Sequence, residues 1–193
     1  MALQIHNTLT REVEPFTPLD PDERKVGMYC CGPTVHDFAH IGNFRTFVFA
    51  DLVRRYLEFR GYEVTHVMNI TDVEDKIIRN VAEQKTTLTQ FTTIYQDAFF
   101  ADLKVLNCTD PHHIPKATDH IPEMIDLIGK LMERGIAYQA PDQSIYFSIE
   151  KYQGCGCQYG RLVKLNFDEM RQGERVSDDE YEKESVADFA LWK

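Results

Sequence analysis

The sequence predicts an α/β fold built on a parallel βαβ unit. Residues 25–31 have the composition of a strand, and Gly32-Pro33 would end it. Residues 44–60 carry apolar side chains at spacings of three and four, which is typical of a helix, and residues 63–69 follow as a second strand. Such units build parallel sheets, whose ligands bind at the carboxyl ends of the strands. The loops after both strands are therefore expected at one edge of the sheet.

After this unit, the sequence predicts helix as far as about residue 106 and then both helix and strand. A helix is predicted from about residue 73 past residue 106, with a break near residues 86–87. Residues 110–136 have the pattern of a turn and a helix, and residues 145–149 alternate like a strand. The strongly acidic stretch 173–185 is expected to be a solvated excursion.

The composition excludes several classes of protein. With 43% hydrophobic and 27% charged residues in 193, the sequence is that of an ordinary globular protein of one or two domains. It has no apolar run long enough for a membrane span and no signal-peptide pattern, so a cytoplasmic location without a membrane partner is expected. The formal charge of -10 argues against a broad nucleic-acid-binding surface.

The densest chemical signal lies in residues 31–45, between the first strand and the first helix. The residues His-Ile-Gly-Asn at 40–43 fall at the start of that helix, where unpaired N–H groups and the helix dipole favour phosphate. Gly42 would let a ligand approach the backbone, and His40 could donate hydrogen bonds that strengthen as charge develops on a phosphate. The alternative is that His40 and Asn43 only cap the helix.

These residues resemble a known signature. His-Ile-Gly-Asn is similar to the His-Ile-Gly-His motif of class I aminoacyl-tRNA synthetases, and further segments resemble the cysteinyl-tRNA synthetase family within that class. The segments occur in family order over nearly the whole chain, at residues 7–11, 28–35, 54–59, 69–78, 115–118 and 188–193. A four-residue motif is weak evidence by itself, whereas six collinear segments make the resemblance specific.

The resemblance implies a domain organisation. Residues 1–108 would hold an N-terminal extension and the first half of a Rossmann-like catalytic domain. Residues 109–187 would form an inserted α+β connective domain, and residues 188–193 would begin the second catalytic half. The sheet would then be incomplete and would have an unpaired edge, which favours association.

The resemblance also implies the reaction. It would be the ATP-dependent, Mg²⁺-assisted activation of cysteine to cysteinyl-adenylate, followed by transfer to tRNA(Cys). His40 and Asn43 would act on the ATP phosphates, and Thr34 and Gly42 would also contact ATP. Asn43 stands where the signature has its second histidine, but its amide can still donate a hydrogen bond. His36 stands where the family motif has tyrosine, so a contact specific to that ring is in doubt.

The amino-acid side of the implied site includes a metal. Cys31 matches the first zinc ligand of the family, and Gly32 and Thr71 match positions that line the cysteine pocket. Thiolate sulfur suits Zn²⁺, and the open position of the metal would take the sulfur of the substrate. The other ligands, a second ATP-binding loop and the anticodon-recognition region are not found in the sequence. The chain by itself is therefore expected neither to bind zinc tightly nor to make cysteinyl-tRNA at a useful rate.

The remaining cysteines are interpreted as structural or exposed. Five cysteines without a secretion signal do not indicate a disulfide framework. Cys30 precedes Cys31 on a strand, so its side chain should face the other way as a buried thiol. Cys155 and Cys157 are closer together than usual zinc ligands, so an exposed loop is preferred to a metal site.

An acidic cluster follows the second strand. Thr71 and Asp72 can cap the next helix. Asp72, Glu74 and Asp75 also resemble a metal-binding cluster, but a helix N-terminus favours negative charge without a metal. Helix capping is the preferred interpretation.

Two alternative functions stay open at this point. One is the cysteine ligase of mycothiol synthesis, which shares the active-site plan but not tRNA. The other is a non-catalytic, nucleotide-binding remnant. The chain could be a fragment, a truncated gene product or one half of a split enzyme whose partner is a separate C-terminal half.

Overall fold

A computed structural model describes residues 3–20, 22, 24–163 and 187–193. The predicted acidic excursion at 173–185 lies outside these residues. The chain divides into two compact units, residues 16–121 and residues 1–15 with 122–193, each of which is described by itself. No helix of the described part is both long and apolar enough to cross a membrane.

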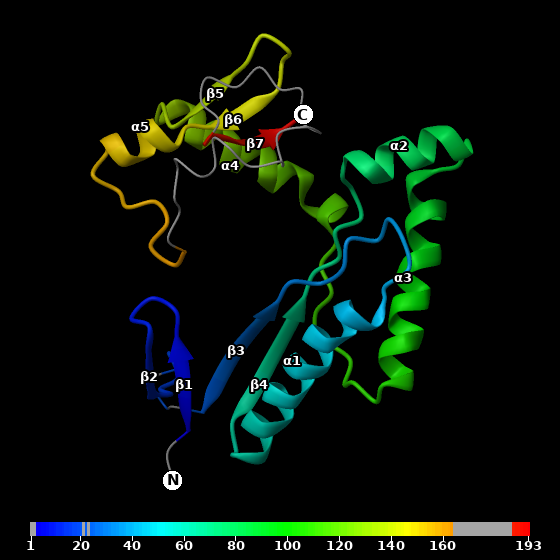
Figure 1. The fold of residues 1–193 in the computed structure, drawn as a ribbon, viewed down its shortest axis with the longest axis vertical. Helices are drawn as coiled ribbons and strands as arrows, with labels where there is room; N and C mark the ends of the chain where they lie inside the picture. The colour runs from blue at the N-terminus through cyan, green and yellow to red at the C-terminus, as the bar shows by residue number, and fades with distance from the viewer. Residues whose placement is uncertain (1–2, 21, 23, 164–186) are drawn as a thin grey trace. The chain divides into compact units, whose positions relative to one another are not determined.

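The first unit contains the predicted βαβ unit (Figure 1). β3 (Lys25–Cys30) pairs with β4 (Glu63–Met68) in parallel, and α1 (Ile41–Phe59) connects them. The parallel pairing confirms the prediction from the sequence. α1 begins three residues before the expected residue 44, because His40 acts as its N-cap. The pairing aligns the carboxyl ends of both strands, with Cys30 opposite Met68.

A third segment lies parallel to β4 on the side away from β3. The N–H of Met68 donates to the carbonyl of His113 at 3.0 Å, and the N–H of Ile70 donates to the carbonyl of Pro115 at 2.9 Å. The carbonyl of Ile70 accepts from the N–H of Ala117 at 3.0 Å. β4 is therefore the central strand, and β3 is an edge strand among the described residues.

The long helix predicted after β4 is two helices. α2 (Asp75–Gln84) and α3 (Leu88–Val105) are separated at the predicted position, where Lys85 has a φ of 52° and Thr87 caps α3. The Thr87 hydroxyl accepts from the N–H of Gln90 at 3.2 Å, which completes a capping box. A short 3-10 helix, η1 (Ala117–His120), follows later in this unit.

The predicted capping of α2 by Thr71 and Asp72 is wrong. The N-cap is Glu74, whose side chain makes no capping hydrogen bond. The buried carboxylate of Asp72 instead accepts hydrogen bonds from the backbone N–H of Thr118 at 3.0 Å and from its hydroxyl at 2.6 Å. Asp72 therefore fixes the loop after β4 to η1.

One face of the β3–β4 pair is covered by α1 and α3. Val64, His66 and Met68 on β4 are buried, and alternate residues of β3 lie beside them. Two apolar clusters fill this side. They consist of Phe44, Met68, Phe99 and Leu103, and of Val35, Ile70, Ile77 and Phe91. The second cluster lies under the loops that follow the two strands, so these loops rest on a packed support.

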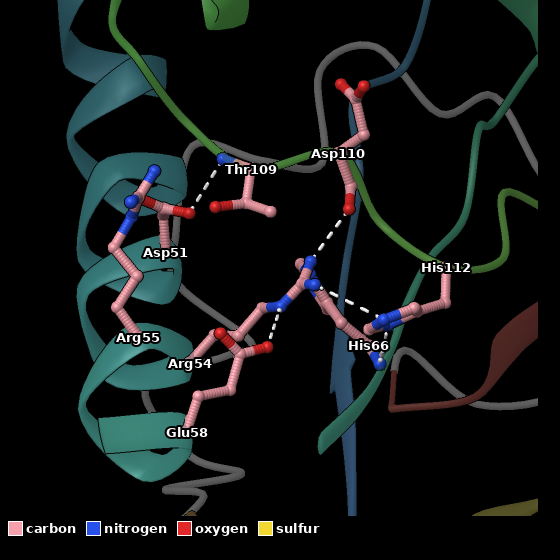
Figure 2. A network of polar contacts seen from close by, with 8 residues as sticks. All are labelled: Asp51, Arg54, Arg55, Glu58, His66, Thr109, Asp110 and His112. Carbon is pink, nitrogen blue, oxygen red and sulfur yellow. Dashed lines mark hydrogen bonds and ion pairs between the residues drawn. The ribbon is translucent and has the colours of Figure 1, made fainter. Parts of the chain in front are cut away.

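A polar network joins α1 to the segment that leads toward residue 113 (Figure 2). The side chain of Arg54 is only 7% exposed; its Nε donates to Glu58 at 2.8 Å, and a terminal nitrogen donates to the carbonyl of Asp110 at 2.7 Å. One turn earlier, the Asp51 carboxylate accepts from the backbone N–H of Thr109 at 2.8 Å. These bonds hold the return segment against α1.

The same segment is fixed to β4 by two histidines (Figure 2). The backbone N–H of His66 donates to Nδ1 of His112 at 2.9 Å, and the N–H of His112 donates to the carbonyl of His66 at 2.8 Å. The imidazole of His66 is buried, and neither of its nitrogens has a hydrogen-bond partner. Burial, with Arg54 and His112 nearby, holds the pKa of His66 below its ordinary value of 6.5.

The second unit contains an N-terminal hairpin and a small α+β region. β1 (Gln4–Asn7) and β2 (Glu12–Pro15) pair antiparallel, a hairpin that the sequence did not predict. The predicted helix and strand are present as α4 (Ile121–Glu133) and β6 (Ile145–Phe147). β6 pairs antiparallel on both sides, and the remaining elements are β5 (Ala137–Gln139), α5 (Ile149–Gly154) and β7 (Phe189–Trp192).

Asp188 fixes the start of β7 within this unit. Its buried carboxylate accepts from the Tyr138 hydroxyl at 3.0 Å and from the Ile149 N–H at 3.0 Å. Residues 188–193 thus pair with β6 in the small sheet and do not extend the β3–β4 sheet. The three-domain division, with its boundaries at 108 and 187, stays a prediction.

The Arg54 network predicts a large stability difference between two adjacent arginines. Arg54→Met leaves the carbonyl of Asp110 and the Glu58 carboxylate without their donor, so we expect a loss of about 3 kcal/mol in the free energy of unfolding. Arg55→Met removes a more exposed guanidinium and should change stability little. Urea denaturation of both variants measures the difference. Equal losses would contradict the assigned role of Arg54.

The buried imidazole of His66 predicts a pH dependence of stability. Because its folded-state pKa lies below 6.5, the unfolded chain binds the proton more readily, and stability is lost as pH falls below about 6.5. His66→Leu should flatten the free energy of unfolding between about pH 7.5 and 5.5. The control His6→Leu, at an exposed position on β1, should keep the wild-type slope. An unchanged slope in His66→Leu would exclude His66 as the cause.

Candidate functional site

The site begins where the backbone after β3 passes close to the backbone after β4. The N–H of Gly32 donates to Oδ1 of Asn69 at 2.9 Å. A Cβ atom at Gly32 would lie 1.7 Å from the carbonyl oxygen of Asn69, so no other residue fits without separating the two loops. The Tyr29 hydroxyl donates to the same Oδ1 at 3.0 Å. Asn69 thus organises the loop, a role that the sequence analysis did not assign.

The two loops then run side by side, as the sequence predicts. The N–H of Val35 donates to the carbonyl of Thr71 at 3.1 Å, and the N–H of Thr71 donates to the carbonyl of Pro33 at 3.0 Å. Thr34 lies opposite Thr71 in this short parallel bridge. The backbone of Thr71 therefore helps to fix the loop that carries the other predicted residues.

The loop ends at a complete capping box on α1. The N–H of Gly42 donates to Nδ1 of His40 at 3.0 Å, and the N–H of His40 donates to Oδ1 of Asn43 at 3.0 Å. A Cβ atom at Gly42 would lie 2.8 Å from Cε1 of His40, so a side chain there would displace the imidazole. Gly42 thus makes room for the capping histidine.

Capping also determines which groups of His40 and Asn43 stay available to a ligand. Because Nδ1 of His40 accepts a hydrogen bond, the neutral imidazole must carry its proton on Nε2. Because Oδ1 of Asn43 accepts, its Nδ2 group is left to donate. Capping and phosphate binding are therefore compatible, and capping turns both side chains into oriented donors at the positive end of a helix dipole.

A cavity of about 440 Å³ lies in front of these donors. Four of the predicted site residues line it, namely Gly32, Thr34, His40 and Asn43, whereas Cys31, Gly42 and Thr71 do not. The remaining wall comes from Pro33, Val35, His36, Asp37, Phe38, Ala39, Thr46, Phe47, Tyr95 and Phe99. The contribution of α3 was not predicted, because no local sequence signal indicates that its aromatic side chains meet the loop.

The described residues do not form a metal site. Cys31 is exposed, and no three His, Cys, Asp or Glu side chains of the described part are grouped closely enough to hold a metal ion. Cys31 would therefore be one ligand among others that these residues do not supply.

The environments of the other cysteines agree with the sequence prediction in part. Cys30 is half-buried and lines a small cavity together with His66 and Cys108. Burial raises the pKa of the Cys30 and Cys108 thiols, so both are kept in the neutral form. Cys155 and Cys157 are exposed beyond α5.

The fold and the site have the features of a class I aminoacyl-tRNA synthetase. Residues 17–193 match the family described as tRNA synthetases class I (C) catalytic domain, and the chain belongs to this family. The His-Ile-Gly-Asn residues that resemble the signature of the class lie where the loop after β3 enters α1.

The curated relatives are cysteine–tRNA ligases. That of Leptospira interrogans is 49% identical over 193 residues, which is all of this chain and 40% of the relative. The proteins of Koribacter versatilis and Chlamydia muridarum are 48% and 49% identical and are covered to 38% and 39%. The chain thus spans about 40% of the length of these relatives.

A solved structure supports the fold. The LeuRS of Agrobacterium radiobacter K84, in a ternary complex with tRNA and LeuAMS, is similar with a TM-score of 0.52. The likeness covers 67% of this chain and 18% of that chain at 19% identity. At this identity the comparison shows the shared fold only.

The close approach of the two loops predicts different effects at two glycines of β3 and its loop. Gly32→Ala places a methyl group on the Asn69 carbonyl and should destabilise the chain by about 3 kcal/mol. Gly27→Ala introduces a methyl group with no atom within 4 Å and should be tolerated. Thermal and urea unfolding of both variants test this difference. Equal tolerance would show that the loops can separate without cost.

Proposed function

We propose that this chain supplies the ATP-binding half of the active site of a cysteine–tRNA ligase. The observation that carries the proposal is the capping bond of His40, a residue that lines the cavity; because Nδ1 accepts that bond, the neutral ring has its N–H donor at Nε2. The identity of about 49% to cysteine–tRNA ligases, over the whole chain, supports this particular reaction.

The residues at the start of α1 suit the first chemical step. In adenylate formation the carboxylate of cysteine attacks the α-phosphate of ATP and pyrophosphate leaves. Nε2–H of His40 and Nδ2–H of Asn43 would donate to phosphoryl oxygens on which negative charge grows. The first turn of α1 adds the partial positive charge of its unpaired N–H groups. Thr34 and the backbone near Gly42 would hold the nucleotide beside these donors, with Mg²⁺ supplied by the ATP complex.

The second substrate would enter on the β-strand side of the loop. Gly32 and Thr71 lie at the carboxyl ends of β3 and β4, where an amino acid could meet the α-phosphate. We place cysteine there, with Cys31 as one ligand of the zinc ion that the family resemblance implies. The remaining ligands must come from outside the described residues. The aminoacyl group would then be transferred to the 3′ end of tRNA(Cys).

The small α+β region between α4 and β7 would be the connective domain inserted into the catalytic fold. Its antiparallel sheet is separate from the parallel sheet of the site. Asp188 and the pairing of β7 with β6 close this region as one packed element. We propose that the second half of the catalytic sheet follows after it.

Exposed apolar surface supports the need for that second half. Val48, Leu52, Tyr56 and Phe59 are all exposed and recur on α1 at helical spacing, although the opposite side of α1 is already packed. On β3, Tyr29 is exposed as well, and among the described residues of the chain β3 has an unpaired edge. Parallel sheets are normally covered on both faces. The relatives' additional length would supply this cover.

Cysteine-dependent exchange of pyrophosphate into ATP tests the proposal. We would measure it for the chain alone and for the chain mixed with the C-terminal remainder of the Leptospira interrogans relative, and quantify zinc in both samples. We expect exchange and stoichiometric zinc only in the mixture. Activity of the chain alone would show that its site is complete, and no activity in either sample would favour a nucleotide-binding remnant.

One substitution connects that activity to the capping histidine. In the active mixture, His40→Ala should lower the exchange rate about 100-fold, because it removes a donor to the phosphoryl group. His6→Ala, at an exposed position on β1, is the matched control and should have no effect. An unimpaired His40→Ala variant would refute the proposed role. A separate assay of cysteine transfer, with tRNA or with an amino sugar as the acceptor, distinguishes the tRNA enzyme from the ligase of mycothiol synthesis.

A further inference from the structure

A second histidine lines the same cavity and has no role in the proposed chemistry. His36 stands in the loop between Val35, which is buried, and Asp37. Its Nδ1 atom is buried and has no hydrogen-bond partner. The other ring nitrogen, Nε2, lies on the opposite edge of the imidazole.

The group that faces Nδ1 is a carboxylate. Oε1 of Glu74, the residue before α2, lies 3.8 Å from Nδ1 of His36 and is itself buried without a hydrogen-bond partner. Two buried atoms without hydrogen-bond partners, a ring nitrogen that can donate and a carboxylate oxygen that accepts, thus face each other at slightly more than hydrogen-bond distance. A small closing movement would satisfy both atoms. Glu74 is not among the residues that line the cavity.

The cavity lacks the usual source of positive charge for an anionic ligand. Among the described residues that line it there is no lysine or arginine, and the whole chain has a formal charge of -10. Oriented dipoles at the start of α1 can offset part of a phosphate charge, but only histidines can add a full positive charge to this wall. Asn43, in place of a histidine, adds none.

We propose that His36, backed by Glu74, is a second phosphate-directed donor that carries a positive charge when the cavity holds a nucleotide. Glu74 would accept a hydrogen bond from Nδ1–H, and Nε2–H on the opposite edge of the ring would donate to a phosphate oxygen. The imidazolium then lies between two anions, which favours its charged form. This inference rests on the proposed nucleotide site and adds to it a charge that depends on pH.

The other titratable groups around His36 are few in the described structure. Asp37, on the same loop, lines the cavity, and its Oδ1 accepts from the N–H of Phe38 at 2.7 Å. His40, at the start of α1, has Nδ1 occupied by the cap. Tyr95 comes from α3. Glu74 is the one carboxylate that the described structure pairs with the His36 ring.

Titration of the chain with ATP, followed by NMR at pH 6 and pH 8, tests the inference. His36→Gln keeps a hydrogen-bond donor but cannot carry a positive charge. Glu74→Gln removes only the negative charge beside the ring. His36→Tyr restores the residue typical of the family motif. The protonation of ATP itself affects all samples equally. The readout is therefore the ratio of the ATP dissociation constants of variant and wild type at each pH. We expect ATP binding at pH 6 to be about tenfold tighter in the wild type than in His36→Gln or Glu74→Gln. At pH 8 the samples should converge.

The outcomes separate this inference from the proposed function. Equal affinities of wild type and variants at pH 6, with saturable shifts in residues 31–43, would overturn the role of His36 and leave the nucleotide site intact. An affinity loss of the same size at both pH values would also overturn it, because a structural role does not depend on the charge of the ring. No saturable shift in the wild type would overturn both.

Discussion

The close passage of the backbone at Gly32 over the carbonyl of Asn69 is the constraint on which the site depends. It forces a residue without a side chain at the carboxyl end of β3 and holds the two loops together through the Asn69 side chain. The parallel bridge between Thr34 and Thr71 continues this contact. The loop from β3 therefore reaches α1 along one defined path, and the capping histidine arrives in one orientation.

That orientation explains how an acidic chain could receive an anionic ligand. The capping bonds of His40 and Asn43 use their acceptor atoms and leave Nε2–H and Nδ2–H as donors on two residues that line the cavity. In the proposed site, the orientation of these donors, more than the net charge of the chain, would make the cavity wall complementary to phosphate. A helix cap and a phosphate site are often treated as competing interpretations of one motif. In the proposed site, the cap would orient the donors that bind phosphate.

The sequence predicted those features that depend on local pattern. Strand and helix periodicity predicted the parallel βαβ unit, and His40 and Asn43 lie at the start of α1, as the sequence predicted. Features set by distant partners were missed. Asp72 binds Thr118, 46 residues away, and Arg54 binds the carbonyl of Asp110, 56 residues away. A carboxylate after a strand suggests a helix cap, and only the tertiary fold shows another donor closer to it.

Hydrogen–deuterium exchange of the chain with and without saturating ATP tests the central claim most directly. If nucleotide phosphates bind where the loop after β3 meets α1, exchange should slow in residues 31–43 and in residues 69–71, which hold that loop. The antiparallel sheet of β5, β6 and β7 should change little. Unchanged exchange in residues 31–43, or protection confined to the small antiparallel sheet, would contradict it.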